Sequence, residues 1–340
     1  MSITSGPESA HNKEHDHSRD AHGHVHGVVD PSIFTTQKGI RAVKWSFFGL
    51  SVTALFQIVV SVLSGSAALL ADTVHNIGDA FTAVPLWIAF LFARRKPSRQ
   101  FTYGYGRVED LAGVFIVFII LASAIVAGYQ SIDRLLHPAK MAYPAMVALA
   151  AIVGFAGNEA VAIYRIRAGR EIGSAALIAD GHHARVDGLT SLSVLAGVIG
   201  VLLGYPLADP VIGLLITLAI LHIVWTSGKE VFRRLLDGVD PEVNSEIRHA
   251  ADHVAGVADI TDVRVRWIGH RLRAEVNIAV DPGSSVEQGH EIALEVRHQL
   301  LHHLRYLSHV SIHVDPANAS GERHHAVDNH THDDLPAHGH

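Results

Sequence analysis

Two stretches of the chain carry the same pattern of acidic and histidine side chains, A-D-x-x-H-x-x-x-D, followed by a small residue. The first covers residues 71–80 and the second residues 179–188, and both lie within long apolar segments. Side chains three and four positions apart share one face of a helix, so each copy would present its acidic and histidine residues as a stripe. A carboxylate at the bilayer centre costs roughly 2.5–3.5 kcal/mol on the insertion scale, so a chain that accepts this cost twice is expected to use the residues.

Four of these side chains have the number and chemical type of the ligands that hold a tetrahedral divalent cation. They are His75, Asp79, His183 and Asp187. An i, i+4 pair on each of two facing helices would supply two bonds per helix, at roughly 2.0–2.2 Å for a zinc ion. The alternative is that they are buried polar pairs that fix helix packing, but their repetition in two segments favours the metal site.

The remaining polar residues of the two stretches are expected to play supporting roles. Asp72 and Asp180 lie one turn nearer the start of each helix, where they would accept the imidazole N–H or attract ions at a vestibule. We take both segments to start from the extracytoplasmic side, which makes them parallel if they are neighbours and puts both aspartates closer to the outside. His182 points about 100° away from His183, so we expect it to face a neighbour or the vestibule. For Asn158 we favour a helix-packing hydrogen bond over metal contact.

The composition is that of a membrane protein. Of 340 residues, 49% are hydrophobic and only 18% are charged, and the mean hydropathy is +0.24. Apolar segments of the length that marks a membrane span occur six times. Their approximate limits are 42–64, 68–93, 110–134, 143–166, 174–203 and 208–232. The Lys and Arg residues between them gather on one side, so the positive-inside rule predicts that both termini are cytoplasmic.

Several classes of protein are disfavoured by what the sequence contains. There is no cysteine, which excludes disulfides and thiolate ligands, and the net charge of −6 argues against a nucleic-acid partner. We find no cleavable signal peptide, because the first 37 residues lack an apolar stretch. Six of the 26 histidines lie within residues 1–30 and six within 317–340. We interpret the tails, 1–37 and 317–340, as disordered weak metal chelators.

The polar region after the last predicted span, residues 239–316, indicates a small separate domain. Helical spacing of apolar residues over 241–255 and 285–304 predicts two helices. Alternation over 263–267, 272–280 and 310–314 predicts three strands, and Gly269-His270 suits a hairpin turn between the first two. The fold class is therefore a six-span α-helical membrane domain, residues 38–238, followed by an α-β-β-α-β, ferredoxin-like α+β domain in the cytoplasm.

These features together resemble the cation diffusion facilitator family of divalent-metal/proton antiporters. The matching features are H-x-x-x-D in spans two and five, the loop Tyr-Gly-Tyr-Gly-Arg-Val-Glu-Asp-Leu-Ala at 103–112, the six spans and the C-terminal domain. The resemblance covers about residues 38–316. It implies a homodimer in the bacterial inner membrane that exports a divalent ion from the cytoplasm in exchange for protons. His/Asp pairs in both helices point to Zn²⁺, with Co²⁺, Ni²⁺ and Cd²⁺ left as alternatives.

The resemblance also implies metal binding by the C-terminal domain at the dimer interface. His290, His313 and Asp315 match family ligand positions, whereas two further positions are Thr261 and Asn277 here. We therefore do not expect a binuclear site. The three matching residues either bind one Zn²⁺ or are ordinary polar groups on the surface. The loop between spans two and three carries Phe101, Tyr103 and Tyr105 where some members have ligands, so we predict no metal there.

Arg107 and Asp237 match the family's charge interlock between helices near the dimer interface; the alternative is an Arg that lies beside lipid headgroups. Two other functional classes differ from this prediction. A membrane metalloenzyme is disfavoured, because the chain has no H-E-x-x-H motif and a metal with four protein ligands leaves no open position for water. A metal-sensing membrane scaffold remains as the second alternative.

Overall fold

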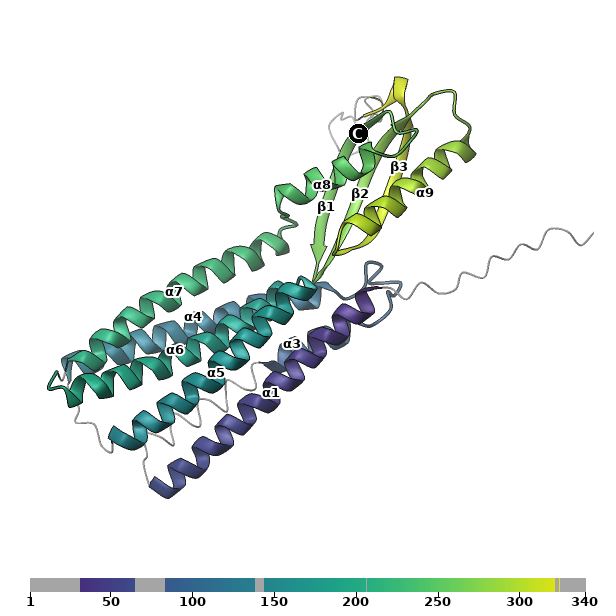
Figure 1. Ribbon diagram of the computed structural model, residues 1–340. Coiled ribbons are helices and arrows are strands. Elements are labelled where there is room, and N and C mark those ends of the chain that lie inside the picture. Colours follow the sequence, from purple (N-terminus) through teal and green to yellow (C-terminus); the bar gives the residue numbers. More distant parts are fainter. Residues whose placement is uncertain (1–30, 65–82, 138–143, 206, 322–323, 325–340) are drawn as a thin grey trace, which may run out of the picture. The chain divides into compact units, whose positions relative to one another are not determined.

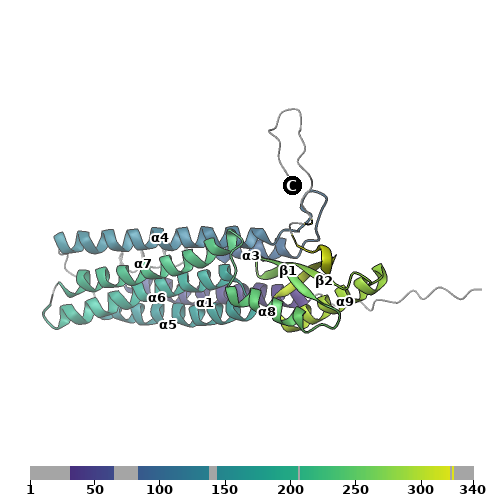
Figure 2. The same cartoon turned by 90° about the horizontal axis from the view of Figure 1, so that it is seen from above.

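The computed structural model describes residues 31–64, 83–137, 144–205, 207–321 and 324 (Figure 1). The N-terminal part of the described chain is helical, and helices α4, α6 and α7 run side by side (Figures 1 and 2). Its helices are α1 (Pro31–Ser64), α3 (Ala83–Ala93), α4 (Arg107–Leu136), α5 (Pro144–Ile172), α6 (Ala175–Leu202) and α7 (Ala208–Leu235).

Four of these helices, α4 to α7, are long and apolar enough to cross a membrane, and α3 is a shorter apolar helix. They agree with the four predicted spans from 110 to 232. Helix α1 contains the predicted span 42–64, and α3 is the described end of the predicted span 68–93. The first part of span two lies outside the described residues, so the count of six spans stays a prediction.

The membrane helices bury apolar side chains between them and also expose them on their outer faces. Leu86, Ile116 and Ile220 are fully buried, and they belong to α3, α4 and α7. In contrast, Leu218 and Trp225 of α7 are largely exposed. Extended exposed apolar surface of this kind marks contact with a membrane or another protein.

Helices α5 and α6 form a closely packed antiparallel pair because glycines lie at their contact. A Cβ atom on Gly181 would lie 2.7 Å from a side-chain carbon of Ile166, and one on Gly169 would lie 2.7 Å from Ile178. Small residues at such positions let helix backbones approach each other. The connection is short, with Gly173 at φ +77°, and Ser174 caps α6 by accepting a hydrogen bond from the amide of Leu177 at 3.1 Å.

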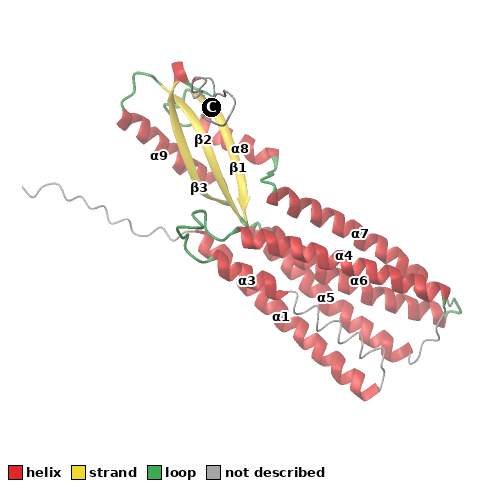
Figure 3. Cartoon of the chain, turned by 180° about the vertical axis from the view of Figure 1, so that it is seen from behind, coloured by secondary structure: helices red, strands yellow, loops and turns green. Residues whose placement is uncertain are grey.

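The C-terminal part is an α+β domain with the predicted order α-β-β-α-β (Figure 3). Its elements are α8 (Pro241–Asp252), β1 (Asp259–Ile268), β2 (Arg271–Val280), α9 (Val286–His303) and β3 (Leu307–Pro316), followed by a 3-10 turn, Ala317–Ala319. Strands β1 and β2 pair antiparallel across Gly269-His270, as predicted, and β3 pairs parallel to β2. Helix α9 forms the crossover that parallel pairing requires.

The strands extend beyond their predicted limits, because backbone pairing continues past the region of clear apolar alternation. Helices α8 and α9 share one core with the sheet, in which Ile247, Val276 and Leu300 are fully buried. Helix α9 begins with a capping box between Ser285 and Gln288. The chain thus folds into an apolar helical part and an α+β part, as the sequence predicts.

Candidate metal-transport site

Helix α6 places His183 and Asp187 on one buried face. Their residue exposures are 1% and 7%, and Nδ1 of His183 lies 3.8 Å from Oδ1 of Asp187. Two ligands of one tetrahedral zinc ion lie roughly 3.4 Å apart, given bonds of about 2.1 Å. A small side-chain adjustment would therefore let both atoms bind one cation. The structure brings this predicted pair together through the i, i+4 geometry of the helix.

The other predicted ligands, His75 and Asp79, lie outside the described residues, as does Asp72. The structure therefore describes only the α6 half of the proposed site. Helix α3, which continues the same predicted span, contacts α6. The four-ligand arrangement remains a prediction.

Asp180 has a different environment from the one we expected. It is fully buried and forms an ion pair with Arg165 of α5, with 3.1 Å between Oδ2 and Nη1. Arg165 is also buried, and its Nη1 donates to the Asp180 carbonyl at 3.4 Å. The close approach of the two helices at Gly181 permits this contact. Asp180 is therefore paired with a charge that we did not expect, and its predicted role at a vestibule or behind the imidazoles stays a prediction.

The predicted direction of the fifth span is wrong. The start of α6 lies beside the α+β domain: the Cβ position of Gly173 is 3.0 Å from the ring of Tyr306. The last turn of α3 also lies there, since Phe90 contacts the ring of His270 with 5.8 Å between centroids. Helix α3 therefore ends where α6 begins, and the two helices run antiparallel. Asp180 lies between the α+β domain and His183, and not on the far side of the site.

Two neighbours that the sequence singled out lie in the same helix pair. His182 directly precedes His183 on α6 and is partly buried. Asn158 is buried on α5, and its Cβ lies 3.5 Å from where a Cβ on Gly188 would be. Asn158 therefore packs at the contact between α5 and α6, and the helix-packing hydrogen bond that we favoured for it stays a prediction.

In the α+β domain, only part of the predicted metal site comes together. Nε2 of His313 lies 2.9 Å from Oδ1 of Asp315, so the two share one side of β3 as expected. His290 is exposed on α9. Among the residues that the structure describes, no three His, Cys, Asp or Glu side chains are grouped to hold a metal. Asn277 is the register partner of His313, and its carbonyl accepts from Thr261 at 3.5 Å.

The aromatic loop between α3 and α4 contacts its own residues and the sheet. The rings of Phe101 and Tyr105 lie 4.9 Å apart between centroids. Two guanidinium groups, from Arg266 and Arg273, lie over the ring of Tyr103 at 4.9 and 5.2 Å. These cation–π contacts give the loop a structural role in place of the ligands that it lacks.

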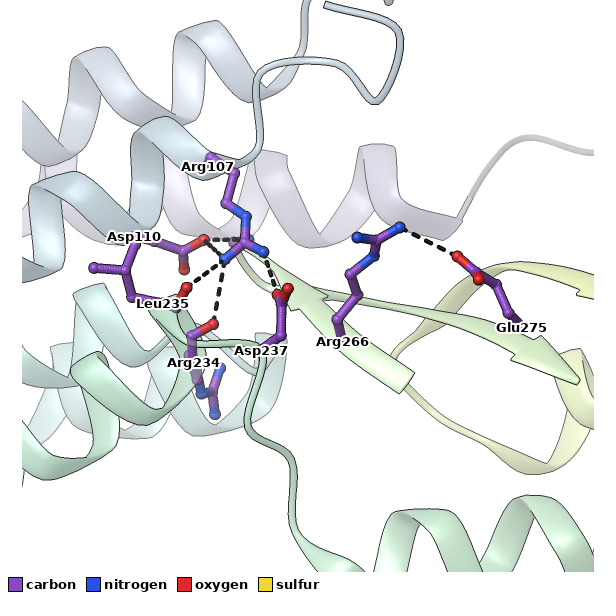
Figure 4. Close-up of polar contacts among 8 residues, drawn as sticks. Arg107, Asp110, Arg234, Leu235, Asp237, Arg266 and Glu275 are labelled. Carbon is purple, nitrogen blue, oxygen red and sulfur yellow. Dashed lines mark hydrogen bonds and ion pairs between the residues drawn. The ribbon is translucent and has the colours of Figure 1, made fainter. Parts of the chain in front are cut away.

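Arg107 and Asp237 form an ion pair within the chain (Figure 4). Arg107 Nη1 also donates to the carbonyls of Arg234 and Leu235 at 3.2 and 3.3 Å, the last residues of α7. Asp237 follows the helix with φ at +61°. A cation at a helix C-terminus complements the exposed carbonyls and the helix dipole. The predicted charge contact is therefore present, while its place near a dimer interface remains a prediction.

Sequence reasoning missed one buried contact. His270, for which the sequence predicts only a turn, lies with its Nδ1 2.6 Å from Oε2 of Glu109 at the start of α4. The side chains are 2% and 1% exposed. The sequence did place a histidine at the tip of the hairpin. Hairpin tips are ordinarily exposed to water, so this position gave little reason to expect a buried contact.

The chain matches two family models. Residues 43–236 match the cation efflux transmembrane domain, and residues 239–317 match the cytoplasmic domain of cation efflux proteins. The chain belongs to the cation efflux family, also called cation diffusion facilitators. It is therefore a multi-pass membrane transporter for cations and not an enzyme, and its α+β domain is of the type associated with dimerisation.

Individual relatives agree with this assignment. A probable cation efflux system protein of Mycobacterium tuberculosis is 55% identical over 85% of this chain and 87% of its own length. Metal tolerance protein C1 of Arabidopsis thaliana is 30% identical over 79% of this chain and 60% of its own. Magnetosome protein MamB of Magnetospirillum gryphiswaldense is 26% identical over 82% of this chain and 95% of its own.

Among solved structures, a variant of the MamM CTD in a manganese form is 32% identical. It matches 22% of this chain and 95% of its own, with a TM-score of 0.22. A zinc form of a MamM CTD variant matches 22% of this chain and 82% of its own, at the same identity and TM-score.

Proposed function

We propose that this transporter exports Zn²⁺ from the cytoplasm in exchange for protons, through a site made by His75, Asp79, His183 and Asp187. The observation that carries the proposal is the buried His183–Asp187 pair on α6, with 3.8 Å between a nitrogen and an oxygen. A second copy of its sequence pattern lies at 71–80. The ligands mix nitrogen and oxygen, which suits zinc better than harder ions such as magnesium or calcium.

Proton exchange follows from the chemistry of these ligands. A histidine binds a metal only when its imidazole is neutral, and a carboxylate only when it is ionised, so protons and metal compete for the same atoms. An unperturbed histidine titrates near pH 6.5, roughly within the range of physiological pH gradients. A pH difference across the membrane would therefore load the site on one side and empty it on the other.

The decisive experiment measures zinc flux into proteoliposomes with an imposed pH gradient. The parent should move zinc, and Asp187→Ala should abolish the flux. The matched control is Asp133→Asn, because Asp133 is also a carboxylate of the membrane helices but is exposed and pairs with His137. A parent that moves no zinc, or an Asp187→Ala variant that moves it as fast as the parent, would refute the proposal.

The same vesicles decide between substrates and between classes. Parallel runs with Co²⁺, Ni²⁺, Cd²⁺ and Mn²⁺ rank the ions, and a dye inside the vesicles reports whether protons leave as metal enters. Metal binding without flux of any of these ions would favour the alternative of a metal sensor or scaffold.

We further propose a homodimer in the bacterial inner membrane with both termini in the cytoplasm. The distribution of Lys and Arg residues supports this orientation. The chain contains no cysteine, so a single introduced cysteine reports its own position. A cysteine at position 137 should react with a membrane-impermeant reagent added to whole cells, and one at position 320 should not. Cross-linking of the purified protein tests the dimer.

A separate question is how the C-terminal domain would bind Zn²⁺. His313 and Asp315 supply two ligand atoms 2.9 Å apart, and a structural zinc site takes four. We propose that any Zn²⁺ bound there by His313 and Asp315 also takes donors from His290 or from a second copy of the chain. Zinc bound per chain, measured at rising protein concentration, would then increase as the dimer forms.

A further inference from the structure

A buried contact joins the β1–β2 hairpin of the cytoplasmic domain to the membrane helices. His270 lies at the tip of the hairpin, and its Nδ1 is 2.6 Å from Oε2 of Glu109 in the first turn of α4. Buried polar groups are costly unless they are hydrogen-bonded. The polar atoms of this pair have hydrogen-bond partners in several other segments of the chain.

Each remaining polar atom of the pair has a partner from a different element. Oγ of Ser174, before α6, donates to Oε1 of Glu109 at 2.5 Å. Oγ1 of Thr36 on α1 lies 3.1 Å from Nε2 of His270. The amide of Gly269 donates to Oδ2 of Asp110 at 3.1 Å. The hairpin tip is therefore bonded directly to α4 and α1, and through Glu109 it is connected to Ser174, the residue before α6.

The hairpin tip fits closely against α4. Gly269 has φ at +62°, and a Cβ there would lie 2.8 Å from both Oε2 of Glu109 and the carbonyl oxygen of Gly106. Only glycine suits a turn with this backbone angle and this little space. The contact is thus specific in shape as well as in hydrogen bonding.

Ser174 links this contact to the helix that carries the proposed ligands. The same hydroxyl that donates to Glu109 accepts from the amide of Leu177 and so caps α6. His183 lies nine positions further along, roughly 13 Å at 1.5 Å per residue. Because α6 is continuous over Ala175–Leu202, a shift at its first turn is carried to His183 and Asp187.

From this chain of contacts we infer that His270 is a positioning residue for metal transport. Through Glu109 and Ser174, it holds the first turn of α6 in position. It thereby links the cytoplasmic hairpin to the proposed metal ligands. The inference rests on the transport function proposed above. It assigns to the hairpin tip a role in turnover, separate from any metal bound by the cytoplasmic domain.

The first test is kinetic and uses zinc flux in proteoliposomes. The variants are His270→Gln, Glu109→Gln and the double variant. Couplings between distant sites typically change an equilibrium by roughly 5- to 150-fold, so each single variant should lower turnover by about fivefold or more. The KM for zinc should stay within about twofold, since the ligands are untouched. The double variant should be no slower than the slower single variant, because the two residues act as one unit.

Tyr306→Phe is the matched control. Tyr306 also joins the two domains, with its hydroxyl donating to the carbonyl of Arg170 at 2.9 Å, but it bonds the end of α5 and not the cap of α6. Its turnover should remain within about twofold of the parent. In combination with His270→Gln the two effects should multiply, as expected for sites that do not share a partner.

The second test needs no transport. Amide hydrogen exchange in the first turn of α6, residues 175–179, should become about tenfold faster in His270→Gln and unchanged in Tyr306→Phe. If either single variant fails to fold, the double variant provides the exchange measurement, because it replaces both ionisable groups with neutral amides.

The outcomes separate the two proposals. A parent that moves zinc, with His270→Gln unchanged in turnover and in exchange at 175–179, overturns the positioning role and leaves the transport function standing. A parent that moves no metal refutes the transport function. Unchanged exchange in α6 would then also refute the structural linkage.

Discussion

The buried ion pair between Asp180 and Arg165 makes a sharp prediction for Asp180→Asn. The substitution keeps the shape of the side chain and removes its charge, so the Arg165 guanidinium stays buried without a counter-charge. At the observed 3.1 Å, the pair attracts by about 5 kcal/mol at an effective dielectric constant near 20. Removing one partner of a buried pair typically costs about 3–5 kcal/mol of stability. We expect the lower end, about 3 kcal/mol, because the Arg165 guanidinium keeps its hydrogen bond to the backbone carbonyl of residue 180.

The control is Glu275→Gln, which makes the same change at the same distance. Glu275 lies 3.1 Å from Arg266 in the cytoplasmic domain, and its side chain is 53% exposed (Figure 4). An exposed pair contributes about 0–1 kcal/mol, so this variant should be nearly as stable as the parent. The double variant Asp180→Asn/Arg165→Gln should regain most of the lost stability, since it leaves no unpaired buried charge.

Equilibrium unfolding of the purified protein in detergent micelles measures these differences. An Asp180→Asn variant as stable as Glu275→Gln would refute a stabilising Asp180–Arg165 pair, and so would a double variant as unstable as Asp180→Asn. A variant with unchanged stability and reduced zinc flux would instead mean that Asp180 handles the ion, as the sequence had suggested.

Three further predictions follow from the same structure. Gly181→Ala should lower the unfolding free energy by about 1–3 kcal/mol, because its Cβ would lie 2.7 Å from an α5 side chain. The control is Gly228→Ala, whose Cβ would lie 3.6 Å from the nearest side-chain atom, an ordinary contact distance. It should be tolerated in the same unfolding assay. Arg107→Gln should cost about 1 kcal/mol, since Asp237 is half-exposed, and should speed amide exchange over 233–238. His313→Ala should leave zinc flux at saturating metal within about twofold of the parent, because His313 lies on β3 of the cytoplasmic domain and not among the proposed transport ligands. A larger loss would tie the cytoplasmic site to turnover.

The sequence was a good guide to features that depend on local patterns. The spacing of His183 and Asp187 fixed a shared helix face, and the structure has them 3.8 Å apart. Apolar length located the four long helices, and alternation with Gly269-His270 located the hairpin. These features follow from helix and strand periodicity and from hydropathy, which a single segment contains in full.

Other features required the packed chain. The direction of α6 was mispredicted, although six alternating spans and a cytoplasmic N-terminus already imply that the fifth span starts on the cytoplasmic side; the contact of Gly173 with Tyr306 corrects it. The Asp180–Arg165 pair depends on the close α5–α6 contact at Gly181. His290 matched a ligand position in sequence but lies exposed, outside any described three-residue group.

The sequence alone determined that this chain places two copies of an Asp/His pattern within apolar segments and follows them with an α-β-β-α-β domain. Only the tertiary structure decided which buried polar groups meet: Asp180 with Arg165, and Glu109 with His270, a contact across 161 positions. The physical reason is that burial makes each unpaired polar group costly, so packed helices select partners by proximity in space and not by spacing along the chain.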